Sequence, residues 1–97
     1  MIENGESLRA LEAALRAQES FARFGQQDSE WRAWLVAARA GRRLDEETKS
    51  REYARNAGDR LSRLEQKWGT EAYKGYLTRP DVQHLRSQLN QAINPQR

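Results

Sequence analysis

The chain lacks cysteine altogether, and this absence excludes disulfide bonds and thiolate metal sites. It has one histidine, His84, which without a cysteine does not supply the ligand set of a zinc site. Its glycines stand apart from one another, so no glycine-rich phosphate loop is present. No spacing marks a nucleophile beside a base, or a pair of carboxylates, as hydrolytic and transfer mechanisms require. We therefore expect a protein that is not an enzyme and that has no metal site and no cofactor.

Long apolar runs are missing as well. Hydrophobic residues make up 37% of the sequence and the mean hydropathy is −1.05. No stretch approaches the roughly 20 apolar residues of a membrane-spanning helix. The first residues, M-I-E-N-G-E-S, contain neither the basic start nor the apolar core of a signal peptide. We expect a soluble, cytoplasmic protein of a bacterium, or of a bacterial virus (phage) or plasmid, with no membrane partner.

Proline and strand-forming residues are scarce. Only Pro80 and Pro95 occur, valine and isoleucine are few, and the helix-forming residues alanine, leucine, arginine, glutamine and glutamate dominate. The composition therefore predicts an all-α fold. A length of 97 residues suits a single helical domain that spans residues 1–97.

Apolar residues recur at helical spacing in five segments. The pattern predicts a compact bundle of four amphipathic helices and one short helix, at about residues 5–24, 29–40, 45–68, 71–77 and 80–93. Gly25 and Gly41 are expected to end the first two helices. Asp28 or Ser29 is expected to cap the second helix, and Asp45 the third.

The apolar faces of the four amphipathic helices are expected to share one core. Their residues are Leu8, Leu11, Leu15 and Ala22, then Trp31, Trp34, Leu35 and Ala38, then Tyr53, Ala57, Leu61, Leu64 and Trp68, and last Val82, Leu85, Leu89, Ala92 and Ile93. Trp31 and Trp34 have two interpretations. A small domain needs its largest apolar groups inside, whereas an exposed tryptophan would suit a partner site. We favour the core interpretation.

Basic residues outnumber acidic ones, 17 to 14, which gives a net charge of +3. All of the basic residues except Lys49, Lys67 and Lys74 are arginine. Arginine suits the recognition of carboxylate and phosphate. A GC-rich genome would produce the same bias, and we favour that explanation because alanine is abundant too. Arg16 and Arg23 each follow a glutamate by four residues, so we expect them to form ion pairs along their own helix.

One group of arginines lies in an interval of the chain that contains no acid. No acid falls between Glu30 and Asp45, and this interval contains Arg32, Arg39, Arg42 and Arg43. Arg42 and Arg43 lie near a predicted helix C-terminus, where the helix dipole by itself favours cations. That explanation does not cover Arg32 and Arg39. We predict that these four arginines contact an acidic partner.

These features predict a non-catalytic interaction protein. It would be a small helical adaptor, regulator or inhibitor that docks onto an acidic surface of a larger protein or protein–nucleic acid complex. The first alternative is direct nucleic acid binding by the segment Arg32–Arg43. The helix after this segment begins D-E-E, which would repel phosphate and argues against a helix-turn-helix. The second alternative is a self-assembling structural protein, for example a homodimer.

Overall fold

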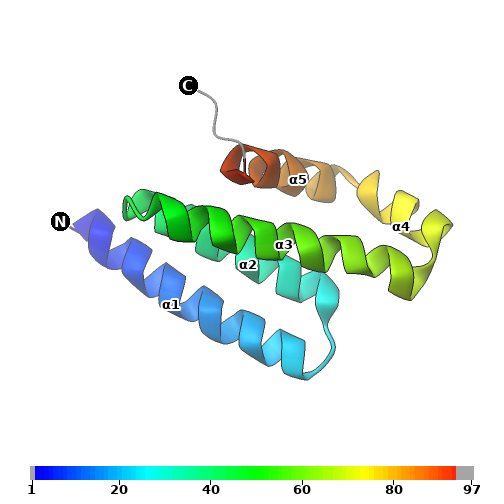
Figure 1. The fold of residues 1–97 in the computed structure, drawn as a ribbon, viewed down its shortest axis with the longest axis horizontal. Helices are drawn as coiled ribbons and strands as arrows, with labels where there is room; N and C mark the ends of the chain where they lie inside the picture. Colours follow the sequence, from blue (N-terminus) through cyan, green and yellow to red (C-terminus); the bar gives the residue numbers. More distant parts are fainter. Residues whose placement is uncertain (1, 94–97) are drawn as a thin grey trace.

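The computed structural model describes residues 2–93, with side chains for residues 5–93. Five helices make up this range: α1 (Ile2–Arg23), α2 (Gln27–Arg43), α3 (Glu47–Trp68), α4 (Thr70–Leu77) and α5 (Pro80–Ile93) (Figure 1). No strand occurs among these residues, so the prediction of an all-α bundle is confirmed. The described residues contain no helix with the length and apolar character that spanning a membrane requires.

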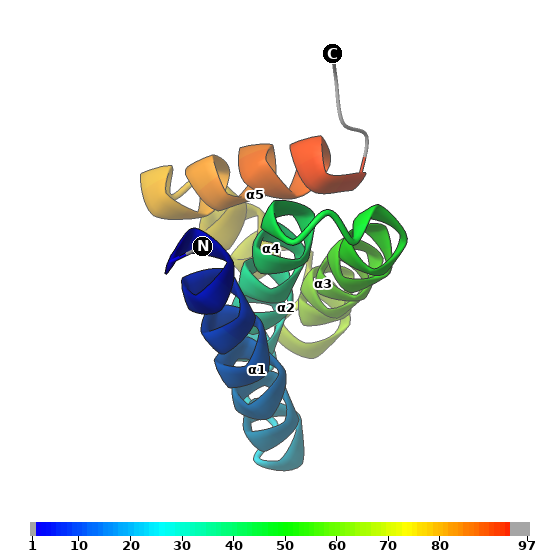
Figure 2. The ribbon, with the colours of Figure 1, turned by 90° about the vertical axis from the view of Figure 1, so that its left-hand side faces the viewer.

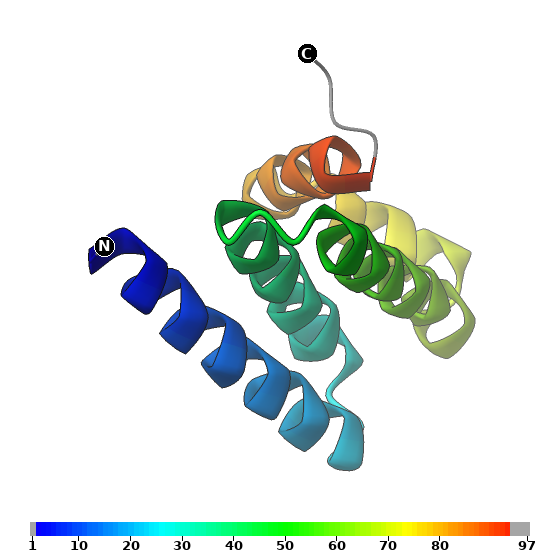
Figure 3. The ribbon, with the colours of Figure 1, turned by 60° about the vertical axis from the view of Figure 1, so that its left-hand side comes forward.

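The first three helices run up and down beside one another, with α2 in the middle (Figure 3). Helix α5 lies across α2 and α3 on one side of this layer (Figure 2). The short α4 connects the far end of α3 to α5 (Figure 1). Within the described residues, α1 packs against α2 alone, whereas α2 also contacts α3 and α5. Helix α2 is therefore the element on which the rest of the fold is assembled.

The turns after α1 and α2 have the same backbone geometry. Gly25 and Asp45 both have a positive φ, of +70° and +60° respectively. In each turn the next backbone N–H donates to a carbonyl of the preceding helix, at 2.8 Å after α1 and 2.9 Å after α2. This pattern is the Schellman C-cap, in which one residue takes the left-handed conformation. Gly25 therefore ends α1, as predicted.

The predicted N-caps of α2 and α3 were wrong. Helix α2 begins at Gln27, so Asp28 and Ser29 lie inside its first turn, and no side chain caps it. Asp45 ends α2 instead of starting α3, which begins at Glu47 without a side-chain cap. The reason is that each Schellman turn is followed by the next helix after a single residue. Asp28 is therefore already inside α2, and Asp45 occupies the left-handed position of the turn, one residue before the N-cap position of α3.

Gly41 does not end α2, which continues to Arg43, so this prediction was also wrong. Gly41 is buried against α3, and a Cβ placed on it would lie 3.6 Å from the Cα and Cβ of Ser50. The Ser50 hydroxyl donates to the Ala38 carbonyl at 2.6 Å, which ties the two helices together at this point. A glycine inside a helix costs only about 1 kcal/mol. The contact with α3 outweighs that local preference.

The main core lies among α2, α3, α4 and α5. Its largest fully buried side chains are Trp31, Leu35, Leu64 and Val82. The Trp31 indole N–H donates to the hydroxyl of Tyr76 at 3.0 Å, so the one polar atom of the ring has a partner. Trp34 is half-buried at the edge of this core, where its ring stacks on Tyr53 at 5.8 Å between centroids. The core interpretation of Trp31 is therefore confirmed.

A second, smaller core joins α1 to α2. It is formed by Leu11, Ala14, Ala37 and Ala40. Two predicted core residues of α1 are wrong, because Leu8 is 50% exposed and Ala22 is exposed as well. Since α1 has a single neighbour, only a narrow stripe of its surface is covered. Trp68, predicted to be in the core, is 37% exposed and packs edge-on against Tyr76.

Ion pairs along and between the helices support this packing. The predicted pair of Glu19 with Arg23 forms at 3.6 Å on the exposed side of α1. A second pair was not predicted: Glu30 of α2, only 4% exposed, accepts a hydrogen bond from the Arg60 guanidinium of α3 at 2.6 Å. It fixes α3 against the first turn of α2.

Candidate anion-binding site

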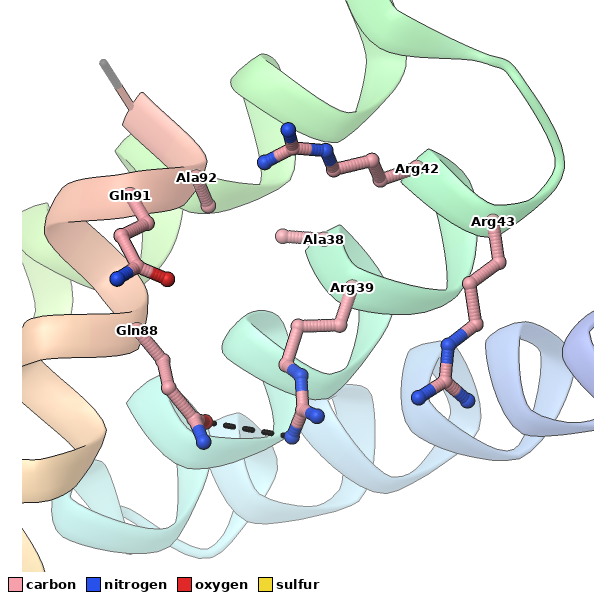
Figure 4. A pocket seen from close by; sticks show the side chains of 7 residues that line it. All are labelled: Ala38, Arg39, Arg42, Arg43, Gln88, Gln91 and Ala92. Atoms are coloured by element: carbon pink, nitrogen blue, oxygen red, sulfur yellow. Dashed lines mark hydrogen bonds between the residues drawn. The ribbon is translucent and has the colours of Figure 1, made fainter. Parts of the chain in front are cut away.

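Three of the four predicted partner-binding arginines gather at one cavity. The cavity has a volume of about 360 Å³ and lies between the C-terminal halves of α2 and α5 (Figure 4). It is lined by Ala38, Arg39, Arg42, Arg43, Gln88, Gln91 and Ala92. Figure 4 shows the two glutamines on one side of the cavity and the three arginines around the other. We refer to Arg39, Arg42 and Arg43 as the arginine cluster.

The hydrogen bonds of Gln88 hold one wall of the cavity in place. Arg39 donates to the side-chain oxygen of Gln88 at 3.2 Å (Figure 4). The amide nitrogen of Gln88 lies 3.0 Å from Nε2 of His84, one turn earlier on α5. Because the Gln88 oxygen accepts from Arg39, its NH₂ group is the donor toward His84. His84 is exposed, as predicted, and helps to orient Gln88.

The arginine cluster has no carboxylate partner in the described part of the chain. None of the ion pairs within 4 Å in that part of the chain includes Arg39, Arg42 or Arg43. Glu47 lines a small crevice beside Arg42, together with Arg51, but makes no ion pair with Arg42. All three cluster side chains are exposed. They can therefore rearrange around a ligand.

The helix dipole accounts for part of this charge. Arg42 and Arg43 are in the last turn of α2, where the unpaired carbonyls carry partial negative charge. The partial charge at a helix end is about half an elementary charge, so it does not balance three guanidiniums. The lining of the cavity therefore carries three positively charged side chains and no negatively charged one. Planar guanidiniums have the geometry that suits a carboxylate or a phosphate group, so the cavity is a candidate anion-binding site.

Arg32 lies apart from the arginine cluster. Its guanidinium donates to the hydroxyl of Tyr76 at 3.2 Å and lies 3.7 Å from the Asp81 carboxylate. The hydrogen bond to Tyr76 raises the pKa of Arg32, partial burial lowers it, and the charge of Asp81 raises it further, with a net increase. The sequence alone did not indicate this pairing, because Asp81 belongs to α5, which is distant from Arg32 along the chain. Arg32 is therefore already paired within the molecule.

Sequence reasoning missed the two glutamines of the site. Gln88 and Gln91 are spaced by three on α5, so they share one face of that helix. This spacing is visible in the sequence, but it does not indicate which helix the glutamines face. Only the crossing of α5 over α2 brings them to the arginine cluster.

The lining of the cavity consists of arginine, glutamine and alanine. Arginine, glutamine and alanine offer neither a nucleophile nor a proton-transfer group near neutral pH. Among the residues that the structure describes, no group of three or more metal-ligating side chains comes together. Comparisons with family models, with curated proteins and with solved structures find no match for this chain.

Proposed function

We propose that the protein is a non-catalytic interaction module, an adaptor or inhibitor that docks onto an acidic surface of a larger protein or protein–nucleic acid complex. The observation that supports this proposal is the arginine cluster: three exposed guanidiniums around one cavity, without a carboxylate partner among residues 5–93. Hydrogen bonds to a charged partner contribute about 1.5–3 kcal/mol each. Two or three such bonds would give an acidic side chain or segment a firm anchor.

The test is affinity capture from the native host with the full-length protein, with and without nuclease. We expect a specific protein to be recovered with the natural chain and to survive nuclease treatment. Changing the arginine cluster to Arg39→Ala, Arg42→Ala and Arg43→Ala should reduce that recovery strongly. A matched variant, Arg9→Ala, Arg16→Ala and Arg55→Ala, removes the same charge from other exposed positions and should retain the partner. Equal recovery by the two variants would contradict the proposal.

Direct binding of nucleic acid is the second candidate function, since the cavity would also accept a phosphate. Trp31 is fully buried, so this tryptophan is not available for stacking on a base beside the arginines. The test is retention on heparin and a gel shift with DNA or RNA over a salt series. A phosphate contact predicts a steep decrease of affinity with salt, and a slope reduced by about one for each cluster arginine removed. Absence of any shift at low salt would eliminate this function.

A further inference from the structure

A groove between α1 and α2 is open to solvent on the side of the layer that carries α5. Its volume is about 480 Å³. Apolar side chains dominate its lining, among them Ala10, Ala13, Ala17, Phe21, Ala33 and Val36. Val36 is 47% exposed despite its aliphatic side chain. Because α1 contacts no helix except α2 in the described residues, nothing there covers this side of the α1–α2 interface.

A line of positive charge runs along the α2 side of the groove. Arg32, Val36, Arg39 and Arg43 are spaced i, i+4, i+7 and i+11, which places them on one strip of α2. Arg32 and Val36 both line the groove, and no acidic side chain does. Arg32 lies 3.7 Å from Asp81, so the unpaired charge of this strip comes from Arg39 and Arg43, which continue it beyond the groove. We refer to Arg32, Arg39 and Arg43 as the arginine row. The groove thus has an apolar floor and one basic edge.

We propose that this groove binds an amphipathic helix of a partner protein, with the apolar stripe of that helix in the groove and acidic residues along the arginine row. The inference rests on the proposed function and names the form of its acidic partner. Two antiparallel helices leave a straight groove, and helix-in-groove recognition uses apolar anchors at i, i+3 or i+4, and i+7. The alanines of the floor permit the close approach of a third helix.

The arginine row sets the size and the charge of the occupant. Eleven residues separate Arg32 from Arg43, which corresponds to about 17 Å along the helix axis. A partner helix of three to four turns would match this length. A second copy of this chain is a poor occupant, because it carries the same arginine row and the same net charge of +3. Charge complementarity therefore favours an acidic helix from a different protein.

The test uses synthetic peptides and the full-length protein. One fluorescent peptide of about 18 residues, roughly five helical turns, carries a leucine stripe flanked by glutamates, and a second has lysine in place of each glutamate. Fluorescence anisotropy at low salt should show binding of the glutamate peptide and at least about tenfold weaker binding of the lysine peptide. Equal affinity for both peptides, or no binding of the glutamate peptide, would overturn the inference.

A matched pair of variants locates the binding. Ala13 lines the groove and Ala22 does not, although both are exposed on α1. Ala13→Arg fills the groove while adding positive charge, so a loss of affinity cannot come from weaker electrostatic attraction. We expect Ala13→Arg to weaken binding of the glutamate peptide at least about tenfold and Ala22→Arg to leave it unchanged. Unchanged binding by Ala13→Arg would overturn the inference. Circular dichroism checks that both variants fold.

Two further measurements separate this inference from the proposed function and from self-association. Arg42 lines the cavity of the arginine cluster but not the groove. A host partner that is lost on Arg42→Ala and retained by Ala13→Arg would uphold the proposed function and overturn the groove. Loss on Ala13→Arg alone would uphold the groove. A dimer in analytical ultracentrifugation that becomes monomeric on Ala13→Arg would show that a second copy occupies the groove, which also overturns the inference.

Discussion

Asp45 adopts a backbone conformation that glycine adopts in the equivalent turn after α1. An L-residue in the left-handed region is strained by roughly 1–2 kcal/mol, although aspartate tolerates it better than most residues do. Asp45→Gly should therefore raise the free energy of unfolding by up to about 1 kcal/mol, and Gly25→Ala should lower it by about 1 kcal/mol. Urea denaturation measures both changes.

The control for this pair is Gly75, which lies inside α4 with open space around it and no positive φ. Gly75→Ala should stabilise the protein by up to about 1 kcal/mol, because alanine favours the helix. The opposite signs expected at Gly25 and Gly75 separate left-handed strain from helix propensity. Stabilisation by Gly25→Ala would contradict the Schellman turn.

Arg60 contacts two carboxylates that differ in burial, and this difference predicts how much each ion pair contributes to the free energy of unfolding. Glu30 is 4% exposed and lies 2.6 Å from Arg60, while the side chain of Asp59 is 53% exposed and lies 2.9 Å away. Glu30→Gln should lower the free energy of unfolding by about 2 kcal/mol, because a buried charge-assisted hydrogen bond is lost. Asp59→Asn, the matched control, should cost about 0.5 kcal/mol. Similar losses for both variants would refute the role assigned to Glu30.

At the scale of elements, Asp81 in the first turn of α5 forms ion pairs with Arg79, just before that helix, and with Arg32 of α2. Partial loss of hydration raises the pKa of Asp81, but the hydrogen bonds from Arg79, the backbone N–H of Val82 and the charge of Arg32 together lower it below its ordinary value of 3.8. A depressed pKa in the folded state means that the ionised carboxylate stabilises folding. This contribution is complete above pH 3.8 and is lost as the pH falls through the lower folded pKa.

Asp81→Asn should therefore be less stable than the natural chain at neutral pH, and the two should converge in acid. The measurement is urea denaturation across a pH series. Arg79→Ala removes the bidentate partner of Asp81 and should abolish part of the same pH-dependent difference. A stability difference for Asp81→Asn that stays constant down to the lowest pH would contradict this linkage.

The elements differ in how far the sequence could predict them. Helix α5 has the predicted bounds, 80–93, because proline at the first helical position sets a steric start. Helix α2 was predicted too short at both ends, since Gly41 gains its helical conformation from a contact with α3, and α2 begins directly after the turn at Gly25. Local signals predicted the existence of each helix. The C-terminal bound of α2 failed because it depends on a contact with another helix, and its N-terminal bound failed because only one residue separates the Schellman turn at Gly25 from the start of α2.

The same distinction applies to the candidate site. The sequence predicted Arg39, Arg42 and Arg43 because no acid falls between Glu30 and Asp45 on the chain. It could not predict the pairing of Arg32 with Asp81, which requires the packing of α2 against α5. The α1–α2 groove was not predicted at all, because helical periodicity gives the direction of a helix face and not the number of helices that cover it.

At the scale of the whole molecule, stability is unevenly distributed. Helix α1 contacts α2 only, through the smaller core, whereas α2–α5 share the core around Trp31. Amide hydrogen exchange should therefore show opening of α1 while α3 remains closed, with exchange in the middle of α1 at least about tenfold faster. Leu11→Ala should accelerate exchange in α1 and leave α3 nearly unchanged. Equal protection of the two helices would contradict this division.

Because α1 packs against α2 alone, it can unfold separately, and only some optical probes will detect that step. The tryptophans and tyrosines all lie between Trp31 and Tyr76, and α1 contains neither. Tryptophan emission will therefore follow α2–α4, while far-UV circular dichroism also counts the 22 residues of α1. If α1 separates first, the ellipticity midpoint on heating will lie below the emission midpoint, and a two-state treatment of either curve will misstate the stability of this protein.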